Sequence, residues 1–273
     1  MYAGDPYSPL RISHAGDLGS HRAVSSRQTC KTKGVAIFSQ RVSNPELRTI
    51  TDNSGRWSIA QVQSENICFT LCTIYGSIVD EPEVFDTVNN ELDSWPVPIV
   101  VCGDLNCQLT KKPPYANSNH RKPRTLAAIH RLIQNHSLVD VWECLHPGVP
   151  GETYYSAPHR KYSRIDFVLA SSTLLSDAKI YLLPKTLSDH NPIILELTAP
   201  KRSLQVKQWT FERAFLYDQN YIDHMKLWSV EFFGYNEGSA DSGVVWDAYK
   251  AAVRGETLCY SIRQQKHKKE ELE

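Results

Sequence analysis

The stretch "VPIVVCGDLN" (97–106) joins an apolar run to a carboxylate and an amide. Residues 97–102 are mostly apolar and β-branched, which predicts a buried strand. Asp104 and Asn106 follow directly at the end of this strand, where a rigid sheet can hold polar groups at its rim. Asp and Asn are also common turn residues, so this stretch taken alone leaves both a turn and a functional site open.

Further short runs rich in β-branched and aromatic residues lie on both sides of this strand and predict a sheet. They cover residues 34–38, 57–62, 66–75, 164–170 and 191–197. Apolar residues at steps of three and four predict amphipathic helices over 81–95 and 125–138. Strands mixed with helices and short loops predict a layered α/β (α+β) domain over residues 34–200.

The two ends of the chain differ from this domain. Residues 1–33 have no clear hydrophobic period, and we expect a loop or tail there. The composition shifts at "TAPKRSL" (198–204), and the spacing of apolar residues beyond it predicts a helical segment over 201–273.

Composition narrows the class of protein. The 273 residues include 30 Lys and Arg and 30 Asp and Glu, so the net charge gives no argument for a nucleic-acid partner. Any such argument must come from local clusters of basic residues. Seven scattered cysteines without framework spacing predict free thiols in a reducing compartment. The sequence shows neither a secretory signal nor a transmembrane segment, so we expect the nucleus or the cytoplasm and no membrane partner.

Polar residues recur where predicted strands begin or end. They lie in "CGDLN" (102–106), "ETYYSAP" (152–158), "SRID" (163–166) and "LSDHNPI" (187–193), and they are Asp104, Asn106, Thr153, Asp166, Asp189 and His190. Carboxylates gathered at one rim repel each other unless a cation or a shared proton lies between them. Oxygen ligands favour Mg²⁺ or Mn²⁺, and a histidine beside a carboxylate can donate to a developing oxyanion. This set predicts metal-assisted hydrolysis of a phosphodiester, although each stretch alone is compatible with an ordinary turn.

Two basic loops flank these polar strand ends. They are "KKPPYANSNHRKPR" (111–124) and "HRKYSR" (159–164), and their candidate phosphate-binding residues are Lys111, Lys112, Arg121, Lys122, Arg124, Arg160 and Lys161. Basic loops beside a carboxylate rim suit a protein that binds the DNA backbone. Ordinary solvated loops remain the alternative.

The motifs "GDLN", "SRIDFVL" and "LSDHNPI", in this order, resemble those of the endonuclease/exonuclease/phosphatase superfamily. The resemblance is closer to one branch, the apurinic-endonuclease-like domain of the second-reading-frame polyprotein of long interspersed (non-LTR) retrotransposons. "GVAIFS", "TIYG", "LVDVWECLHP" and "TYYSAPHRKYSRIDFVL" also fit this branch. The C-terminal part resembles the helical segment between its nuclease and its reverse transcriptase, so the resemblance covers residues 34–273.

This resemblance implies a four-layered α/β sandwich that nicks duplex DNA with Mg²⁺. It implies that Asp104 positions the attacking water, that Asn106 contacts the scissile phosphate, and that Asp166 orients His190 to stabilise the pentacovalent phosphorane. It further implies a metal-binding role for Asp189, beside that of Asp104, and phosphate contacts from Tyr75 and Thr153. The loop 155–163 matches one that approaches the DNA groove next to the cut.

The N-terminal region departs from the family pattern. The family domain begins with a strand carrying an Asn and a strand ending in a Glu, the principal metal ligand, and residues 1–33 resemble neither. We therefore expect an N-terminally truncated domain. Three functions stay open: a DNA-nicking endonuclease, an inactive remnant that at most binds nucleic acid, and a phosphatase of the same superfamily. No obligate protein partner can be inferred.

Overall fold

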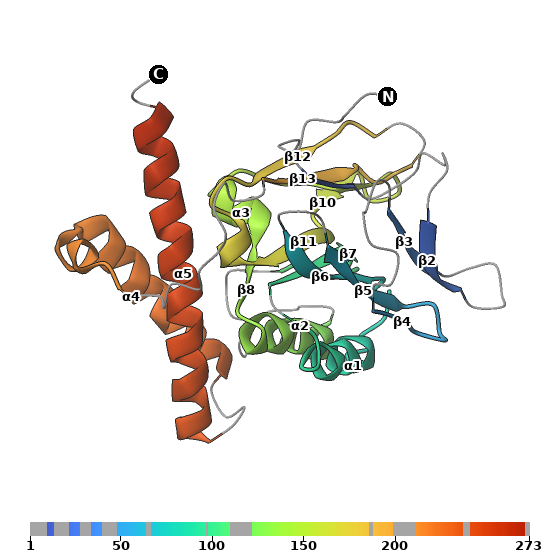
Figure 1. The fold of residues 1–273 in the computed structure, drawn as a ribbon, viewed down its shortest axis with the longest axis horizontal. Helices are drawn as coiled ribbons and strands as arrows, with labels where there is room; N and C mark the ends of the chain where they lie inside the picture. The colour runs from blue at the N-terminus through green and yellow to red at the C-terminus, as the bar shows by residue number, and fades with distance from the viewer. Residues whose placement is uncertain are drawn as a thin grey trace.

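A mixed six-stranded sheet forms the centre of the fold (Figure 1). The structure is a computed structural model that describes residues 10–13, 22–27, 34–39, 48–63, 67–96, 98–109, 122–185, 188–198, 211–236 and 241–270. The strand order is β4 (Thr49–Thr51), β5 (Trp57–Gln63), β6 (Cys68–Ile74), β7 (Ile99–Asp104), β11 (Asp166–Ser171) and β8 (Leu138–Asp140). β6 and β7 are parallel, and the other pairs in this sheet are antiparallel.

Two helices cover one face of this sheet (Figure 1). They are α1 (Glu83–Leu92) and α2 (Pro123–Asn135), and both were predicted from their apolar spacing. α1 buries Phe85, Val88 and Leu92 against the sheet, whereas Val84 is only partly buried. The helix layer and the sheet share one apolar core, whose burial stabilises the arrangement.

A smaller sheet covers the opposite face. It consists of β1 (Leu10–Ser13), β13 (Ile193–Leu197) and β12 (Lys179–Leu182), all antiparallel. A hairpin of β2 (Arg22–Arg27) and β3 (Gly34–Ser39) lies against β5. The described residues thus form helix, sheet and sheet layers, which confirms the predicted α/β sandwich and accounts for three of its four expected layers.

The prediction of a loop or tail over residues 1–33 is wrong for two segments. Leu10–Ser13 pairs with β13, and Arg22–Arg27 pairs with β3. Both segments are short and lack a clear hydrophobic period, so nothing local marks them as strands. β1 pairs with β13, which is distant in the sequence, and β2 pairs with β3, the next strand along the chain. These pairings, and not local propensity, make the two segments strands.

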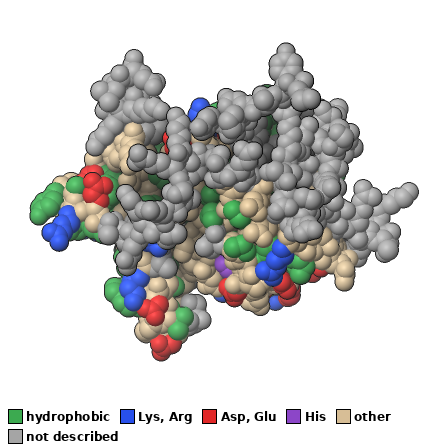
Figure 2. Space-filling view, in the orientation of Figure 1, with side chains coloured by type: hydrophobic (Ala, Val, Ile, Leu, Met, Phe, Trp, Pro, Cys, Tyr) green, Lys and Arg blue, Asp and Glu red, His purple; other side chains and the backbone are tan. Residues whose placement is uncertain are grey.

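The C-terminal segment is helical, as predicted. It contains η2 (Arg213–Tyr217), α4 (Gln219–Asn236) and α5 (Ser242–Glu270). α5 packs against α2, β8 and the short helix α3 (Val141–Leu145), where Arg263 Nε donates to the Cys144 carbonyl at 2.9 Å. Figure 2 shows hydrophobic side chains exposed beside acidic and basic ones over α4. Within the described ranges, every helix is too short or too polar to cross a bilayer.

Candidate active site

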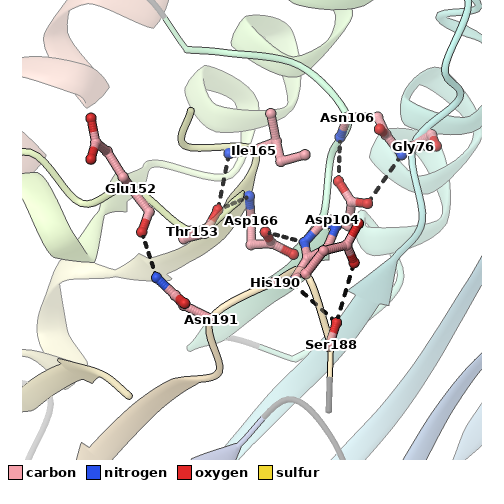
Figure 3. Close-up of polar contacts among 11 residues, drawn as sticks. Gly76, Asp104, Asn106, Glu152, Thr153, Ile165, Asp166, Ser188, His190 and Asn191 are labelled. Carbon is pink, nitrogen blue, oxygen red and sulfur yellow. Dashed lines mark hydrogen bonds and ion pairs between the residues drawn. The ribbon is translucent and has the colours of Figure 1, made fainter. Parts of the chain in front are cut away.

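The candidate site lies where β6 and β7 end and β11 begins (Figure 3). The antiparallel register places Asp166 directly opposite Asp104. Gly103 has a φ of 137°, and a Cβ there would lie 2.1 Å from the Ile74 carbonyl oxygen. A Cβ on Gly76 would lie 2.1 Å from the Leu105 carbonyl oxygen. These two glycines therefore let the ends of β6 and β7 approach closely beside the carboxylates.

His190 reaches the two carboxylates from the loop that precedes β13. A β-bridge joins it to Tyr154, and the two rings lie 4.9 Å apart between centroids. His190 Nδ1 lies 2.8 Å from Asp166 Oδ2 (Figure 3). Ligand atoms of Asp104, Asp166 and His190 all lie within 4.8 Å of one another. The structure thus gathers in one place three residues that are up to 86 positions apart in the sequence (190 − 104).

The electrostatics of this group are unusual for a structural site. Burial and the neighbouring Asp166 carboxylate raise the pKa of Asp104 to about 6. The hydrogen bond to Asp166 raises the pKa of His190 above its ordinary value, although burial opposes this. Asp166 itself is 5% exposed. Like charges directly opposite each other in a sheet destabilise it, so the pair calls for a proton or a cation between the two carboxylates.

The donor set fits a divalent cation. Mg²⁺ is usually held by one or two carboxylates, with water and substrate phosphate completing the coordination. Asp104 offers one such carboxylate: its Oδ1 accepts from the Asn106 backbone N–H at 2.8 Å and its Oδ2 from Asn106 Nδ2 at 3.1 Å, which leaves further lone pairs. Asp166 is buried and engaged by His190. Asp104 would therefore be the main ligand, with Asp166 behind it.

Asp189, the other predicted metal ligand, does not belong to this group. Its carboxylate is exposed, and its Oδ1 lies 3.5 Å from Ser188 Oγ. It acts on the site at longer range, since its charge contributes to the raised pKa of His190 after the larger effects of Asp166.

Thr153, for which a phosphate contact is predicted, is 1% exposed, and that contact stays a prediction. Its Oγ accepts from the backbone N–H groups of Ile165 at 3.2 Å and Asp166 at 3.1 Å (Figure 3). Thr153 therefore fixes the start of β11. Asn106 also works inside the protein, since its Nδ2 donates to the Gly76 carbonyl and to Asp104 Oδ2, both at 3.1 Å.

The other predicted phosphate contacts are placed in different ways. Tyr75 follows β6 and donates its backbone N–H to the Arg56 carbonyl at 2.7 Å. Lys122 turns inward and donates to backbone carbonyls of the site. Arg124 is exposed and pairs with Glu83 at 3.3 Å. Lys111, Lys112 and Arg121 lie outside the described residues.

The predicted loop 155–163 is a hairpin of β9 (Tyr154–Ser156) and β10 (Lys161–Ser163). Arg160 and Lys161 are exposed at its tip. The rings of Tyr155 and Tyr162 lie 4.6 Å apart, and Tyr162 is 54% exposed. Because Tyr154 contacts His190, this basic and aromatic hairpin projects from the edge of the candidate site.

Sequence reasoning missed a partly buried ion pair close to Asp166. Arg164 donates to both carboxylate oxygens of Asp140, at 3.1 and 2.7 Å, and its guanidinium lies 4.7 Å from the centroid of the Phe167 ring. Burial raises the pKa of Asp140 even though Arg164 opposes the shift. An arginine two residues before Asp166 was a visible signal, but its partner lies 24 residues away and the sequence gives no pairing.

Comparison with known proteins agrees with this fold and these motifs. A model of the family described as "Endonuclease-reverse transcriptase" matches residues 69–194. The chain is 24% identical over 230 residues to the "Transposon TX1 uncharacterized 149 kDa protein" of Xenopus laevis. This match covers 81% of the chain but 17% of that protein, so the chain spans a small part of its relative.

Two solved structures share the fold. The AP endonuclease LMAP from Leishmania major matches with a TM-score of 0.53 and 17% identity, over 66% of this chain and 71% of that one. The 3′-5′ exonuclease NExo from Neisseria meningitidis matches with a TM-score of 0.51 and 20% identity, over 65% of this chain and 80% of that one. The family match, the transposon relative and the shared fold agree: the chain is similar to proteins of the endonuclease/exonuclease/phosphatase superfamily, and among them to those of retrotransposon type.

Proposed function

We propose that this chain hydrolyses phosphodiester bonds of DNA with the help of Mg²⁺ or Mn²⁺, cutting one strand of a duplex. The observation that carries the proposal is the direct opposition of Asp104 and Asp166 beside His190. A fold gains no stability from two facing carboxylates, so their presence at a strand end favours a chemical role.

His190 and Asp166 supply the electrostatic part of this proposal. Asp166 accepts a hydrogen bond from Nδ1 and so fixes the orientation of the imidazole ring. The raised pKa keeps more of the ring protonated near neutral pH. The other nitrogen, Nε2, would donate to a phosphate oxygen as negative charge develops in the pentacovalent phosphorane.

Asp104 supplies the part that acts on water. Its carboxylate is held by Asn106 on both oxygens, and with a pKa of about 6 it is largely ionised at neutral pH while still able to accept a proton. The water oxygen forms the new bond to phosphorus and Asp104 takes the water proton, while the bond from phosphorus to the leaving sugar oxygen breaks and that oxygen takes up a proton from the solvent. A divalent cation held by Asp104 would polarise the phosphate as a Lewis acid.

Nicking of supercoiled plasmid tests the proposal. We expect the chain to produce open circles with Mg²⁺ or Mn²⁺, EDTA to stop it, and His190→Ala to lower the rate by about 10²-fold or more. Lys250→Met is the matched control, because Lys250 is an exposed α5 residue that pairs with the exposed Asp247 at 2.6 Å. Equal rates for the unaltered chain and His190→Ala, or no nicking with either cation, would overturn it.

Binding of nucleic acid without hydrolysis is the second candidate. The observation that favours it is the small donor set: within the described part of the chain, the group that could hold a metal contains only Asp104, Asp166 and His190. A DNA affinity that falls steeply with salt, with no cleavage under any divalent cation, would support this role instead.

A further inference from the structure

Lys122 connects two loops of the candidate site. It immediately precedes Pro123, the first residue of α2, and its Nζ donates to the Ser77 carbonyl at 2.8 Å and to the Asn106 carbonyl. Ser77 lies in the loop that follows β6, and Asn106 in the loop that follows β7. One ammonium group therefore joins the two backbone segments that border the carboxylates. Charge-assisted hydrogen bonds of this kind are stronger than neutral ones.

The Asn106 loop is held by several further hydrogen bonds. Asn106 has a φ of 49°, in the left-handed region that Asn adopts more readily than most residues with a side chain. Its backbone N–H donates to Asp104 Oδ1 at 2.8 Å, and its side chain donates to Asp104 Oδ2 and the Gly76 carbonyl. Lys122 donates to the Asn106 backbone carbonyl. The backbone N–H, the backbone carbonyl and the side-chain amide nitrogen of Asn106 therefore all take part in hydrogen bonds.

The start of α2 is fixed to the same loop by a second contact. Asp80 Oδ1 accepts from the Thr125 N–H at 2.8 Å, and Asp80 Oδ2 accepts from the Arg124 N–H at 3.3 Å. Asp80 thus caps α2 from the loop after β6, while Lys122 binds that loop from the helix side. The backbone from which the Lys122 side chain extends is therefore held close to the loop after β6.

The charge of Lys122 also suits this place. Burial and Asp166 raise the pKa of Asp104, and the Lys122 ammonium opposes them. Burial lowers the pKa of Lys122 itself. A cation that donates to two backbone carbonyls near a carboxylate pair is poorly placed to reach into a DNA backbone.

We propose that Lys122 is a positioning residue of the phosphodiester centre: its ammonium holds the loops after β6 and β7 together and thereby fixes Asn106 and Asp104. This inference rests on the proposed function, and it replaces the expectation that Lys122 binds a DNA phosphate. The two roles predict different kinetics. A positioning residue affects kcat, whereas a residue that binds only the DNA backbone affects KM and the salt dependence of binding.

Kinetics of three variants separate the two roles. We expect Lys122→Met to lower kcat about 10- to 100-fold, with KM and the salt slope of DNA binding little changed, and Lys122→Arg to recover part of the loss because a guanidinium can donate to both carbonyls. Lys161→Met, which removes the same charge from the exposed hairpin, should raise KM instead and reduce the salt slope by about one. A Lys122→Met variant that behaves like Lys161→Met, with kcat unchanged, would overturn the proposal.

Amide hydrogen exchange tests the same idea without any catalysis. In the protein free of metal and DNA, peptides covering 75–82 and 102–109 should exchange at least tenfold faster in Lys122→Met than in the unaltered chain, while peptides of α1 and β11 stay the same. If Lys122→Met does not fold, Lys122→Ala, which removes the donor and the charge, serves in its place. Unchanged exchange in both loops would overturn the positioning role. Failure of the unaltered chain to nick DNA would count against the proposed function alone.

Discussion

Two carboxylates flank β11 and have opposite surroundings. Asp140 ends β8 on one side of β11, and Asp104 ends β7 on the other. Asp140 faces the guanidinium of Arg164, which donates to both of its oxygens. Asp104 faces the carboxylate of Asp166. The charge of Asp140 is therefore balanced by Arg164, whereas the charge of Asp104 must be balanced by a proton or a cation. We infer that Asp140 has a structural role and Asp104 a catalytic one.

The largest effect should come from Asp166→Asn. An amide at this position would donate to His190 Nδ1 where the carboxylate now accepts, so the ring would lose both its orientation and the cause of its raised pKa. We expect plasmid nicking to slow by about 10²–10⁴-fold. The midpoint of urea unfolding should not fall, because the variant also removes a like charge facing Asp104. A nicking rate within twofold of that of the unaltered chain would contradict the catalytic role assigned to Asp166 and His190.

Arg164→Met tests the structural side. It leaves the partly buried Asp140 carboxylate without its cation, so we expect the free energy of unfolding to fall by about 1–3 kcal/mol. Urea denaturation followed by far-UV circular dichroism measures this change. The double variant Asp140→Asn with Arg164→Met should lose clearly less, because it leaves no unpaired carboxylate at this partly buried position. If the single and double variants are equally stable, the ion pair does not have the role assigned to it.

Asp104→Asn should have a smaller and opposite effect on stability. The pKa of Asp104 is about 6 in the folded chain and near 3.8 when unfolded, so the folded state binds the proton more tightly. Its contribution to stability is complete below pH 4 and is lost as the pH rises through 6. We therefore expect the variant to gain about 1–3 kcal/mol on the unaltered chain between pH 4 and pH 7, reduced by solvent screening. Unfolding curves at both pH values measure this, and a constant difference would contradict it.

The smallest effect should come from the hairpin. Lys161 is exposed on β10 and makes no contact with the carboxylates, so Lys161→Met should leave the unfolding midpoint unchanged. If the hairpin contacts the DNA backbone, the affinity should drop and its salt slope should fall by about one. Binding measured by fluorescence anisotropy over a series of salt concentrations gives this slope. If the salt dependence of binding is the same in Lys161→Met and in the unaltered chain, Lys161 does not contact the DNA backbone.

Much of this contrast could be predicted from the sequence. Apolar runs that predict strands lie next to Asp104, Asp166 and His190. Residues at the ends of neighbouring strands lie at the same edge of a sheet, so their proximity could be expected. The predicted helices and central strands are confirmed because their apolar residues repeat at the spacing of each element. The opposition of Asp104 and Asp166 could not be predicted, because it depends on the register of β7 against β11.

The direction of polar side chains was harder to predict. Lys122 lies in a basic run, which suggests a solvent-facing cation, yet its ammonium binds two backbone carbonyls. Thr153 lies beside two tyrosines at a strand end, yet its hydroxyl is buried against the β11 backbone. Such contacts join segments 12 to 45 residues apart, so local sequence carries no sign of them.

The rate of plasmid nicking by Asp104→Asn tests the central claim most directly, because this variant should fold at least as well as the unaltered chain. The claim predicts a rate at least a hundredfold lower with saturating Mg²⁺ or Mn²⁺, although the unfolding midpoint at pH 7 is equal or higher. A stable Asp104→Asn protein that nicks DNA as fast as the unaltered chain would contradict it.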